Sequence, residues 1–544
     1  MTPLRRLLIL LAAIVTTAPA FADNGPIVAS PAGRVQGREQ GGVQIFEGIP
    51  YAAPPVGPLR WRPPAPPPTW SDVRPATAFG PACLQPRGGP ATIYTDPPPS
   101  MSEDCLTLNI WTPASAAKAP VMVWIHGGAF WGGTGSEAIY DGSAFAARGV
   151  VVVTINYRLG VLGWLAHPEL SAEPPDGVSG NYGLLDQIAA LEWVKRNIAA
   201  FGGDPTNVTI AGQSAGGLSV LYLMVSPPAR GLFAKAIAES SYMVTTPDLK
   251  RAAFGLPSAE EAGEKLAAKL RAPDVAALRA MDGGKLTDAA AMAGFGPFGA
   301  VDGRILPRQL VDSFDRGEQA PVPILAGFTS GELRSLTALL PPEPPSSDAY
   351  EAIIHARYGD LANAFLKLYP ANALHESMLA ATRDALYGWT AVRVVTKQAA
   401  LGEPAFLYVF DHGFPSADRA GLHAFHASEL PYVFGTLERT PPNWPKAPET
   451  PAEAGLSDAM LDYWTSFMRT GQPRSSRGPD WPQYDKAGVA MAFQAQAKLA
   501  GNVLPGMYAF HEEVMCRRRA KGHQPWNWNV GIASPPLPPK GSCP

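Results

Sequence analysis

The sequence of 544 residues has little charge and no long run of one sign. Charged residues make up 17% of the chain, and the formal net charge is −3. Nucleic acids are bound through clustered Lys and Arg side chains, so this balance argues against nucleic acid as a partner. Apolar residues make up 46%, which excludes a disordered chain and supports a large buried core.

Long apolar runs are also lacking. After the first 22 residues, no segment reaches the roughly 18 uninterrupted apolar residues of a membrane-spanning helix, so we expect no stable membrane insertion. One short apolar run, residues 7–15, follows a basic start and precedes the small-residue site Ala20-Phe21-Ala22. This layout is typical of a secretory signal peptide cut before Asp23. We expect residues 1–22 to be that signal peptide and the mature protein to be secreted or periplasmic.

Cysteine is scarce, since the chain has only Cys83, Cys105, Cys516 and Cys543. In an exported protein, four cysteines can form two disulfides, and three pairings are possible. Pairing of nearest neighbours closes the shortest loops. We therefore expect the disulfides Cys83–Cys105 and Cys516–Cys543.

Strands and helices alternate through the middle of the chain. The strand candidates are apolar throughout, as a parallel sheet covered on both faces requires: residues 121–125, 150–155, 208–211, 323–326 and 405–410. Helices are predicted over 184–200 and 218–225. The alternation indicates an α/β fold with a doubly wound, mostly parallel sheet. Two Ala-rich stretches, 247–320 and 335–402, are predicted to be helical excursions from the sheet.

A possible nucleophile follows the third strand candidate. Residues 208–217, VTIAGQSAGG, run from a β-branched strand into Gly-x-Ser-x-Gly and then into a helix. This order is typical of a nucleophile elbow, a turn so tight that both flanking positions require glycine. The turn places the Ser214 hydroxyl at a helix N-terminus, where the dipole favours developing negative charge. We expect Ser214 to be a catalytic nucleophile rather than part of an ordinary turn.

A serine nucleophile needs a base and an orienting acid, which follow it in the chain order acid, then histidine. His423 and His426 lie in one loop after a predicted strand, and both are candidates for the base. Glu332 follows the strand candidate 323–326, although position alone favours a solvated loop glutamate.

The loop after residues 121–125 predicts an oxyanion hole. It contains His126-Gly-Gly-Ala-Phe130, and small residues let backbone N–H groups approach a substrate oxygen. We expect N–H groups of Gly128, Ala129 and Ala215 to form this hole. His126 is predicted to support the loop rather than to act as a base.

Together these motifs resemble the type-B carboxylesterase family, which includes the cholinesterases, within the α/β-hydrolase fold. The similarity extends from about Gly33 to Asp485. Longer signatures also match: FEGIPY at 46–51, SEDCLTLNIW at 102–111 and GNYGLLDQ at 180–187.

The resemblance implies roles for individual residues. It places the family's nucleophile on Ser214, its acid on Glu332 and its base on His426 rather than His423. A serine that supports the triad in the family aligns with Ser240, and the family's first disulfide matches Cys83–Cys105. The implied substrate is a small-molecule ester, and the implied chemistry needs no metal or cofactor.

Some positions depart from the family pattern. Gln213 stands where the family usually has glutamate, and Ala129 replaces the third glycine of the Gly-rich loop. The loop between Cys83 and Cys105 has no tryptophan, whereas cholinesterases stack choline on one there. The expected organisation is a signal peptide 1–22, a type-B carboxylesterase domain 23–515 and an irregular, polar tail 516–544.

Two other functions fit parts of the sequence. One is a catalytically silent adhesion or binding protein with a hydrolase fold, as in neuroligins, but those lack the nucleophile that Ser214 supplies. The other is a metal site at His423, His426 and Glu429, which Pro431 and the lack of further clustered ligands weaken. The sequence therefore predicts a secreted serine hydrolase of carboxylic esters that forms an acyl-enzyme. No motif indicates one particular ester or an oligomeric state.

Overall fold

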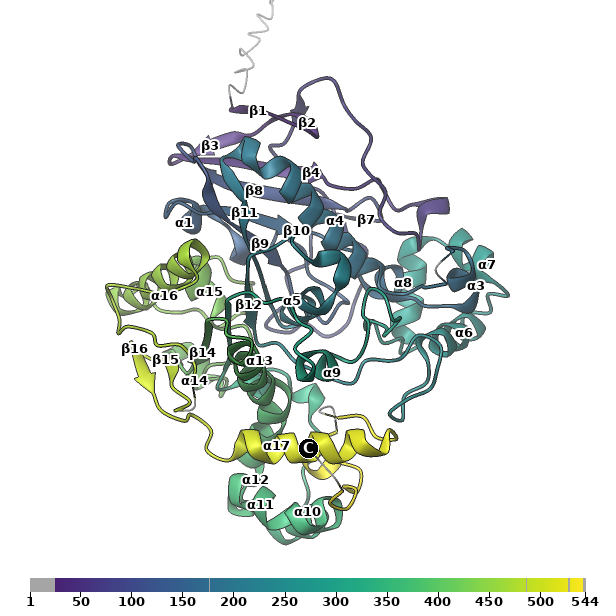
Figure 1. Cartoon of the computed structure of the whole chain (residues 1–544), viewed down its shortest axis with the longest axis vertical. Coiled ribbons are helices and arrows are strands. Elements are labelled where there is room, and N and C mark those ends of the chain that lie inside the picture. Colours follow the sequence, from purple (N-terminus) through teal and green to yellow (C-terminus); the bar gives the residue numbers. More distant parts are fainter. Residues whose placement is uncertain (1–24, 176, 486, 527–528, 542–544) are drawn as a thin grey trace, which may run out of the picture.

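The structure, a computed structural model, describes residues 25–175, 177–485, 487–526 and 529–541. Within these residues the central sheet has 11 strands (Figure 1). They follow across the sheet in the order β16 (Ala497–Ala500), β15 (Ala490–Phe493), β14 (Ala405–Phe410), β13 (Ile324–Thr329), β12 (Lys235–Glu239), β11 (Gly203–Gln213), β9 (Ala119–Ile125), β10 (Val151–Ile155), β8 (Thr107–Pro113), β4 (Val43–Pro50) and β3 (Arg38–Gln40). Neighbours from β15 to β10 are parallel, and antiparallel pairs lie at both ends.

Alternate side chains of the central strands pack into two different cores. In β9, Val121 and Val123 belong to one core, whereas Met122 and Trp124 belong to the other. Helices α4 (Tyr182–Asn197), α5 (Ala215–Val225) and α13 (Trp389–Ala400) cover the first face, and α1 (Ser143–Ala146) and α16 (Pro451–Thr470) cover the second. Because both faces are covered, the strands are apolar throughout. The predicted doubly wound α/β sheet is confirmed.

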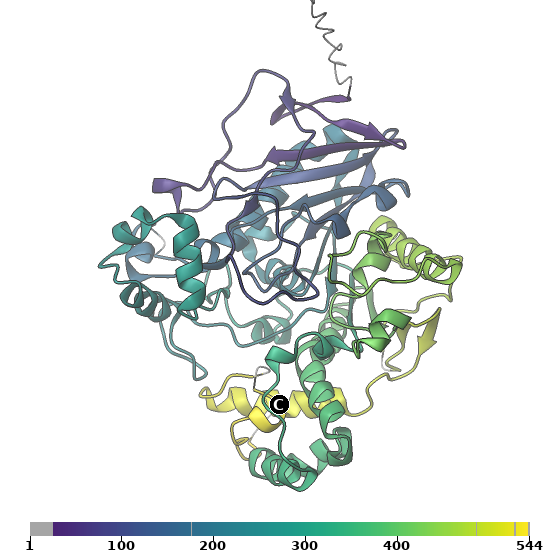
Figure 2. The same ribbon diagram turned by 180° about the vertical axis from the view of Figure 1, so that it is seen from behind.

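Two helical excursions leave the sheet, after β12 and after β13 (Figure 2). The first contains α6 (Ala259–Lys269), α7 (Val275–Ala280), α8 (Gly283–Met292) and α9 (Leu310–Asp315). The second contains α10 (Ser347–Tyr358), α11 (Ala362–Leu368), α12 (Leu374–Arg383), the π-helical turn η9 (Asp384–Gly388) and then α13. Short polar side chains cap three helix N-termini in the first excursion by accepting hydrogen bonds from backbone N–H groups. They belong to Ser258, Asp274 and Asp282. Both predicted excursions are therefore helical.

The C-terminal end differs from the prediction. Helix α17 (Met507–Lys521) crosses the expected boundary between residues 515 and 516. The expectation of irregular structure is therefore wrong for residues 516–521. Gly506 and Gly522, both in the left-handed conformation, flank the helix, and the stretch between them has neither Gly nor Pro. Beyond α17, the described residues are irregular except for the 3₁₀ turn η10 (Gly531–Ala533).

Several expectations concern the termini and the cysteines. The predicted signal peptide 1–22 lies outside the described residues, as does Cys543. Cys83 and Cys105 form a disulfide. Cys516 is disulfide-bonded as well, and the pairing with Cys543 stays a prediction. None of the helices in the described chain is both long enough and apolar enough to cross a membrane.

Candidate active site

Ser214 occupies a strained turn between β11 and α5, with φ 57° and ψ −121°. Non-glycine residues rarely adopt such a conformation unless the surrounding structure imposes it. A Cβ on Gly212 would meet the backbone carbon of Gly216 at 2.6 Å, and one on Gly216 would collide with the carbonyl of Ile125. The Ser214 N–H donates to the Glu239 carbonyl at 3.0 Å. Only glycine fits on both sides, so the chain is held in the predicted elbow with Ser214 partly exposed.

Glu332 and His426 meet from loops that follow adjacent strands. Glu332 opens the 3₁₀ turn η5 (Glu332–Arg334) after β13, and His426 precedes α15 (Leu430–Phe434) after β14. The Nδ1 atom of His426 is hydrogen-bonded to Oε2 of Glu332, and both side chains are buried. The Thr329 N–H donates to the other carboxylate oxygen at 2.9 Å. Because the Nδ1–H group of His426 donates a hydrogen bond to Glu332, Nε2 of the neutral ring carries no proton and can accept one.

Gln213 contacts that acceptor atom. Its side-chain Nε2 lies 3.2 Å from Nε2 of His426, and the amide N–H donates because the ring nitrogen is unprotonated. The Ser214 hydroxyl takes part in none of the hydrogen bonds of the described residues. The structure thus brings Ser214, Glu332 and His426 to one end of the sheet. However, Nε2 of His426 accepts its hydrogen bond from the side-chain amide of Gln213 and not from the Ser214 hydroxyl.

The Gly-rich loop after β9 lies against the elbow. A Cβ on Gly127 would lie 3.3 Å from the Cβ of Ser214. Gly128 and Ala129 have φ values of 102° and 54°, and both are exposed. Ala215 is the first residue of α5, where a backbone N–H has no acceptor within the helix. Across the described part of the chain, no hydrogen bond uses the N–H groups of Gly128, Ala129 or Ala215. These groups are free to bind a substrate oxygen.

His126 supports this loop. Its Nδ1 atom donates to the Gly127 carbonyl at 2.8 Å, and its ring stacks on Tyr157 with centroids 4.5 Å apart. Burial lowers the pKa of His126 to about 4, so the ring is neutral near pH 7. These contacts agree with a supporting role rather than a catalytic one.

Tyr94 contacts the backbone of the candidate base, which the sequence did not indicate. Its hydroxyl is hydrogen-bonded to Ser335 Oγ at 2.7 Å and to the carbonyl oxygen of His426 at 2.9 Å. Ser335 Oγ also accepts the His426 N–H at 3.3 Å. The only sequence signal for Tyr94 is that it is the single aromatic residue between Cys83 and Cys105. Through Tyr94, the disulfide loop thereby fixes the backbone carbonyl of His426 directly and its backbone N–H by way of Ser335.

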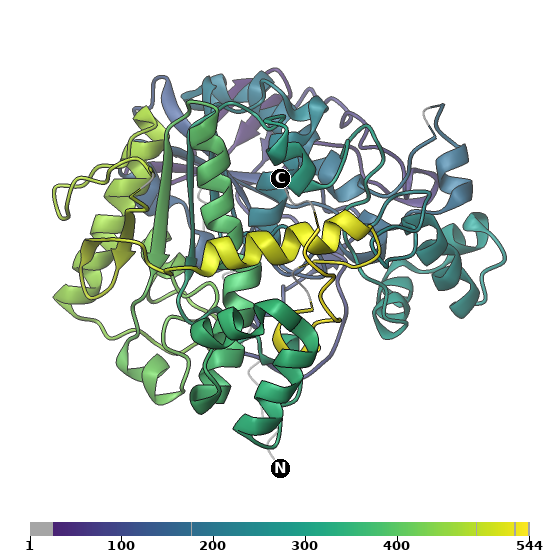
Figure 3. The same cartoon turned by 60° about the horizontal axis from the view of Figure 1, so that its bottom comes forward.

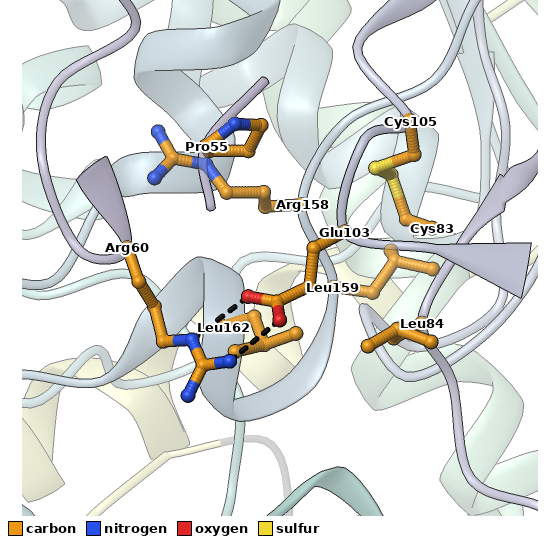
Figure 4. Close-up of a pocket in the computed structure, with 9 residues that line it drawn as sticks. All are labelled: Pro55, Arg60, Cys83, Leu84, Glu103, Cys105, Arg158, Leu159 and Leu162. Atoms are coloured by element: carbon orange, nitrogen blue, oxygen red, sulfur yellow. Dashed lines mark hydrogen bonds and ion pairs between the residues drawn. A yellow bond between two sulfur atoms is a disulfide. The ribbon is translucent and has the colours of Figure 1, made fainter. Parts of the chain in front are cut away.

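The base of the disulfide loop is anchored as well. Figure 4 shows a small pocket beside Cys83–Cys105, where Arg60 and Glu103 form an ion pair. The Arg60 Nε–H donates to Glu103 at 2.7 Å, and its Nη1 donates to the Met281 carbonyl at 2.8 Å. Met281 belongs to the first excursion. The disulfide loop is therefore joined both to the site and to this excursion.

Two further carboxyl groups are buried near the triad. Glu239 pairs with Gln213 across β11 and β12, and Trp464 Nε1 donates to its Oε1 at 2.7 Å. Burial raises the pKa of Glu239 to about 8, against the opposing effect of the Trp464 bond. Burial, and then the charges of Glu239 and Glu332, raise the pKa of Glu429 well above its usual range. With a pKa of about 8, Glu239 is mainly protonated at neutral pH.

Two other predicted residues form no hydrogen bond with a triad side chain among the described residues. The Ser240 N–H donates to the Gly327 carbonyl at 2.8 Å, and its buried hydroxyl has no hydrogen-bond partner in the described chain, so its supporting role stays a prediction. His423 is hydrogen-bonded to Asp418 at 2.9 Å and to Asp411 at 3.2 Å. Hydrogen bonding to Asp411 is the main cause that raises its pKa. In the described chain, no group of three or more ligating side chains could hold a metal ion.

Proteins of known activity or structure are similar to this chain over most of its length. The family model described as "Carboxylesterase family" matches residues 24–510. A fumonisin B1 esterase of Sphingopyxis macrogoltabida is 40% identical over 481 residues, which cover 85% of each chain. A para-nitrobenzyl esterase of Bacillus subtilis (strain 168) is 38% identical over 464 residues, 84% of this chain and 92% of the other. A solved PNB esterase structure matches with a TM-score of 0.76 at 34% identity, covering 89% of this chain and 99% of that one.

Proposed function

The chain belongs to the carboxylesterase family and is a carboxylic-ester hydrolase, and we propose that it cleaves small-molecule esters through an acyl-enzyme on Ser214. One observation carries this proposal. Ser214 stands in a strained elbow at the end of the sheet where His426 and Glu332 form a buried pair. In the proposal, Ser214 is the nucleophile, His426 is the general base, and Glu332 holds the imidazole in the required tautomer.

The proposed reaction has two similar halves. The Ser214 hydroxyl oxygen attacks the ester carbonyl carbon while its proton passes to Nε2 of His426. The resulting oxyanion accepts hydrogen bonds from the N–H groups of the Gly-rich loop and of Ala215. In other enzymes, removing one such donor lowers kcat by about 10²–10³-fold. Collapse breaks the bond to the alcohol, which leaves with the imidazolium proton. Water then attacks the acyl-enzyme in the same way and releases the acid.

Gln213 affects the first step. The Nε2 atom of His426 has one lone pair, and in the structure the Gln213 amide donates to it. The Ser214 hydroxyl can act only when it takes the place of that amide. We therefore propose that Gln213 holds the neutral imidazole at rest and gives way when the serine hydroxyl turns toward it.

Uncharged esters are the proposed substrates. Gln213 is neutral, and Tyr94, the aromatic residue of the disulfide loop, packs against Trp444 with centroids 5.6 Å apart and uses its hydroxyl to bind Ser335 and His426. Near the Gly-rich loop, Trp131 packs edge-on against Phe295 at 6.2 Å and presents apolar surface. Two similar proteins are named for fumonisin B1 and para-nitrobenzyl esters, which supports esters without a quaternary ammonium.

Export is also proposed, from the signal-peptide pattern of residues 1–22. The disulfide Cys83–Cys105 supports it, because disulfides persist in oxidising compartments. The proposed hydrolase domain begins at residue 23 and extends through Lys521, since α17 crosses position 515. Mass spectrometry of the exported protein should find Asp23 at the N-terminus and no free thiol. A retained leader with four free thiols would contradict export.

The test of the mechanism is pre-steady-state hydrolysis of p-nitrophenyl butyrate. An acyl-enzyme predicts a burst of nitrophenol approaching one equivalent per chain, followed by slower turnover. Ser214→Ala should show neither burst nor turnover, whereas His423→Ala should retain both. Turnover by Ser214→Ala at the wild-type rate would overturn the proposal.

A further inference from the structure

We propose that the C-terminal segment, residues 507–526, sets the substrate-size preference of the active site by positioning Tyr387, which lies beside His426, and Tyr242, which packs against Tyr387. The inference rests on the proposed function, because it assigns a role in specificity to residues around the proposed base. It goes beyond the family match, which ends at residue 510.

Tyr387 lies next to the imidazole and Tyr242 packs against Tyr387, and we call these two rings the tyrosine wall. The Tyr387 ring lies 5.4 Å from the His426 ring, and the Tyr242 ring lies 6.0 Å from Tyr387 at an interplanar angle of 87°. Tyr387 belongs to the π-helical turn η9, and such turns are frequent at functional sites. Tyr242 follows Ser241, whose Cβ would lie 3.1 Å from a Cβ on Gly217 in the helix after the nucleophile. A substrate group on this side of Ser214 would therefore meet these rings.

Trp526 clamps the loop that carries Tyr242. It is only 1% exposed, although it lies in an irregular part of the C-terminal segment. Its indole N–H donates to the Met243 carbonyl at 3.1 Å, and its backbone N–H donates to Thr245 Oγ1 at 2.8 Å. The ring also packs edge-on against Phe254 at 5.1 Å. Trp526 thus fixes the residues directly after Tyr242.

Helix α17 holds the other tyrosine. It contacts both η9 and α13, and Figure 3 shows it crossing α13. Glu512 accepts the Trp389 indole N–H at 2.7 Å, and the Met507 Cε atom would lie 3.4 Å from a Cβ on Gly388. Gly388 and Trp389 directly follow Tyr387 in the chain. One C-terminal segment therefore contacts both segments that carry the wall.

Two arginines join α17 to the two excursions. Arg519 forms an ion pair with Asp312 of α9, in the first excursion. Arg517, whose side chain is 1% exposed, pairs with Asp360 of the second excursion at 2.7 Å. Because the Arg517 guanidinium is buried, loss of the Asp360 carboxylate would remove a partner that stabilises its charge. The segment is therefore anchored well enough to hold the two tyrosines in place.

This arrangement separates substrate choice from chemistry. Among the described residues, Trp526 forms no hydrogen bond or ring contact with Ser214, Glu332 or His426, so its loss leaves the triad in place. Removing its large ring would free the 242–245 loop and let Tyr242 move away from Tyr387. The space beside the imidazole would increase, and kcat/KM for esters with large acyl groups would rise relative to kcat/KM for esters with small ones.

The experiment compares kcat/KM for p-nitrophenyl decanoate and p-nitrophenyl acetate, well below the unfolding temperature. Trp526→Ala should raise the decanoate-to-acetate ratio about tenfold, with the burst per folded chain unchanged. Trp526→Phe, which removes the indole N–H but keeps an aromatic ring, should raise it about threefold. Trp193→Phe is the matched control, because Trp193 is equally buried and its indole nitrogen has no partner among the described residues. Its ratio should equal that of the wild type.

The outcomes separate this proposal from the proposed function. An unchanged ratio in both Trp526 variants, with a normal burst, would overturn the role of the C-terminal segment and leave the serine mechanism standing. Absence of a burst in the wild type would instead contradict the serine mechanism. If Trp526→Ala does not fold, the ratio of Trp526→Phe decides: a rise supports the proposal, and the wild-type ratio overturns it.

Discussion

The side-chain amide of Gln213 lies 3.2 Å from Nε2 of His426, the ring nitrogen that must accept the proton of Ser214 in the proposed mechanism. The opposite ring nitrogen is hydrogen-bonded to Glu332. An amide N–H can donate only to a neutral imidazole. A carboxylate in the same place would instead favour the protonated ring. The identity of residue 213 should therefore affect the pH at which the enzyme becomes active.

Gln213→Glu should move the acid limb of the kcat/KM profile to higher pH by about one unit, because the added charge stabilises the inactive imidazolium. Gln496→Glu adds the same charge at an exposed position and should leave the limb in place. The measurement is kcat/KM for p-nitrophenyl acetate from pH 5 to 9. Coincident profiles for wild type and Gln213→Glu would show that Gln213 does not act on the base.

Ser214→Ala and His426→Ala should each lower kcat by about 10⁴-fold or more, since members of a triad act as a unit. Circular dichroism and thermal unfolding should show that both variants fold. His423→Ala should retain most activity, because His423 is hydrogen-bonded to Asp411 and Asp418 instead of Glu332. If His423→Ala were inactive and His426→Ala active, the base would be His423, and the assignment to His426 would be wrong.

Glu239 should make the protein less stable as the pH rises. Its pKa is about 8 in the folded state against an ordinary value of 4.5, so between these values the folded chain binds the extra proton. Stability from this group is complete below pH 4.5 and is lost as the pH rises through 8, by at most about 1.4 kcal/mol per pH unit.

Glu239→Gln tests this expectation, since the amide oxygen can still accept the Trp464 N–H. Relative to wild type, the variant should gain free energy of unfolding between pH 5 and pH 8, as measured by urea denaturation. Parallel curves for the two proteins across this range would show that Glu239 is already ionised in the folded state.

Neutral esters should be preferred over choline esters. A cation–π contact contributes about 0.5–2 kcal/mol, and this chain has neither the tryptophan in the disulfide loop nor a carboxylate at position 213. Butyrylcholine and 3,3-dimethylbutyl butyrate share an acyl group and nearly the same shape, but only the first carries a positive charge. We expect a kcat/KM about tenfold higher for the neutral ester. A clear preference for butyrylcholine would contradict this account of Gln213.

The central strands were predictable because burial on both faces leaves a simple apolar pattern. The predicted strand 405–410 coincides with β14, and the predicted 121–125 lies within β9. In contrast, β12 was not predicted, since its sequence KAIAE contains residues that are uncommon in strands. Its neighbours β11 and β13 impose the extended conformation by pairing on both sides. Helix α17 was missed because polar residues dominate it and its partners lie far away in the sequence.

The chain order of the candidate triad was predictable, whereas the contacts around it were not. The elbow motif identifies Ser214, but His423 and His426 lie three residues apart in one loop. Spacing alone leaves both histidines open, the family resemblance selects His426, and the structure shows that the His426 side chain faces Glu332. Tyr94 and Trp526 contact residues more than 250 positions away. No local pattern encodes such contacts, because they depend on how distant loops pack against one another.

The most direct test of the central claim is labelling with a fluorophosphonate probe, which reacts with activated serine hydroxyls. Intact mass should show one adduct per chain, and peptide mapping should place it on Ser214. Ser214→Ala should remain unlabelled, while His423→Ala should label fully. An adduct on a different residue, or no adduct on a protein that still hydrolyses esters, would contradict a Ser214 acyl-enzyme.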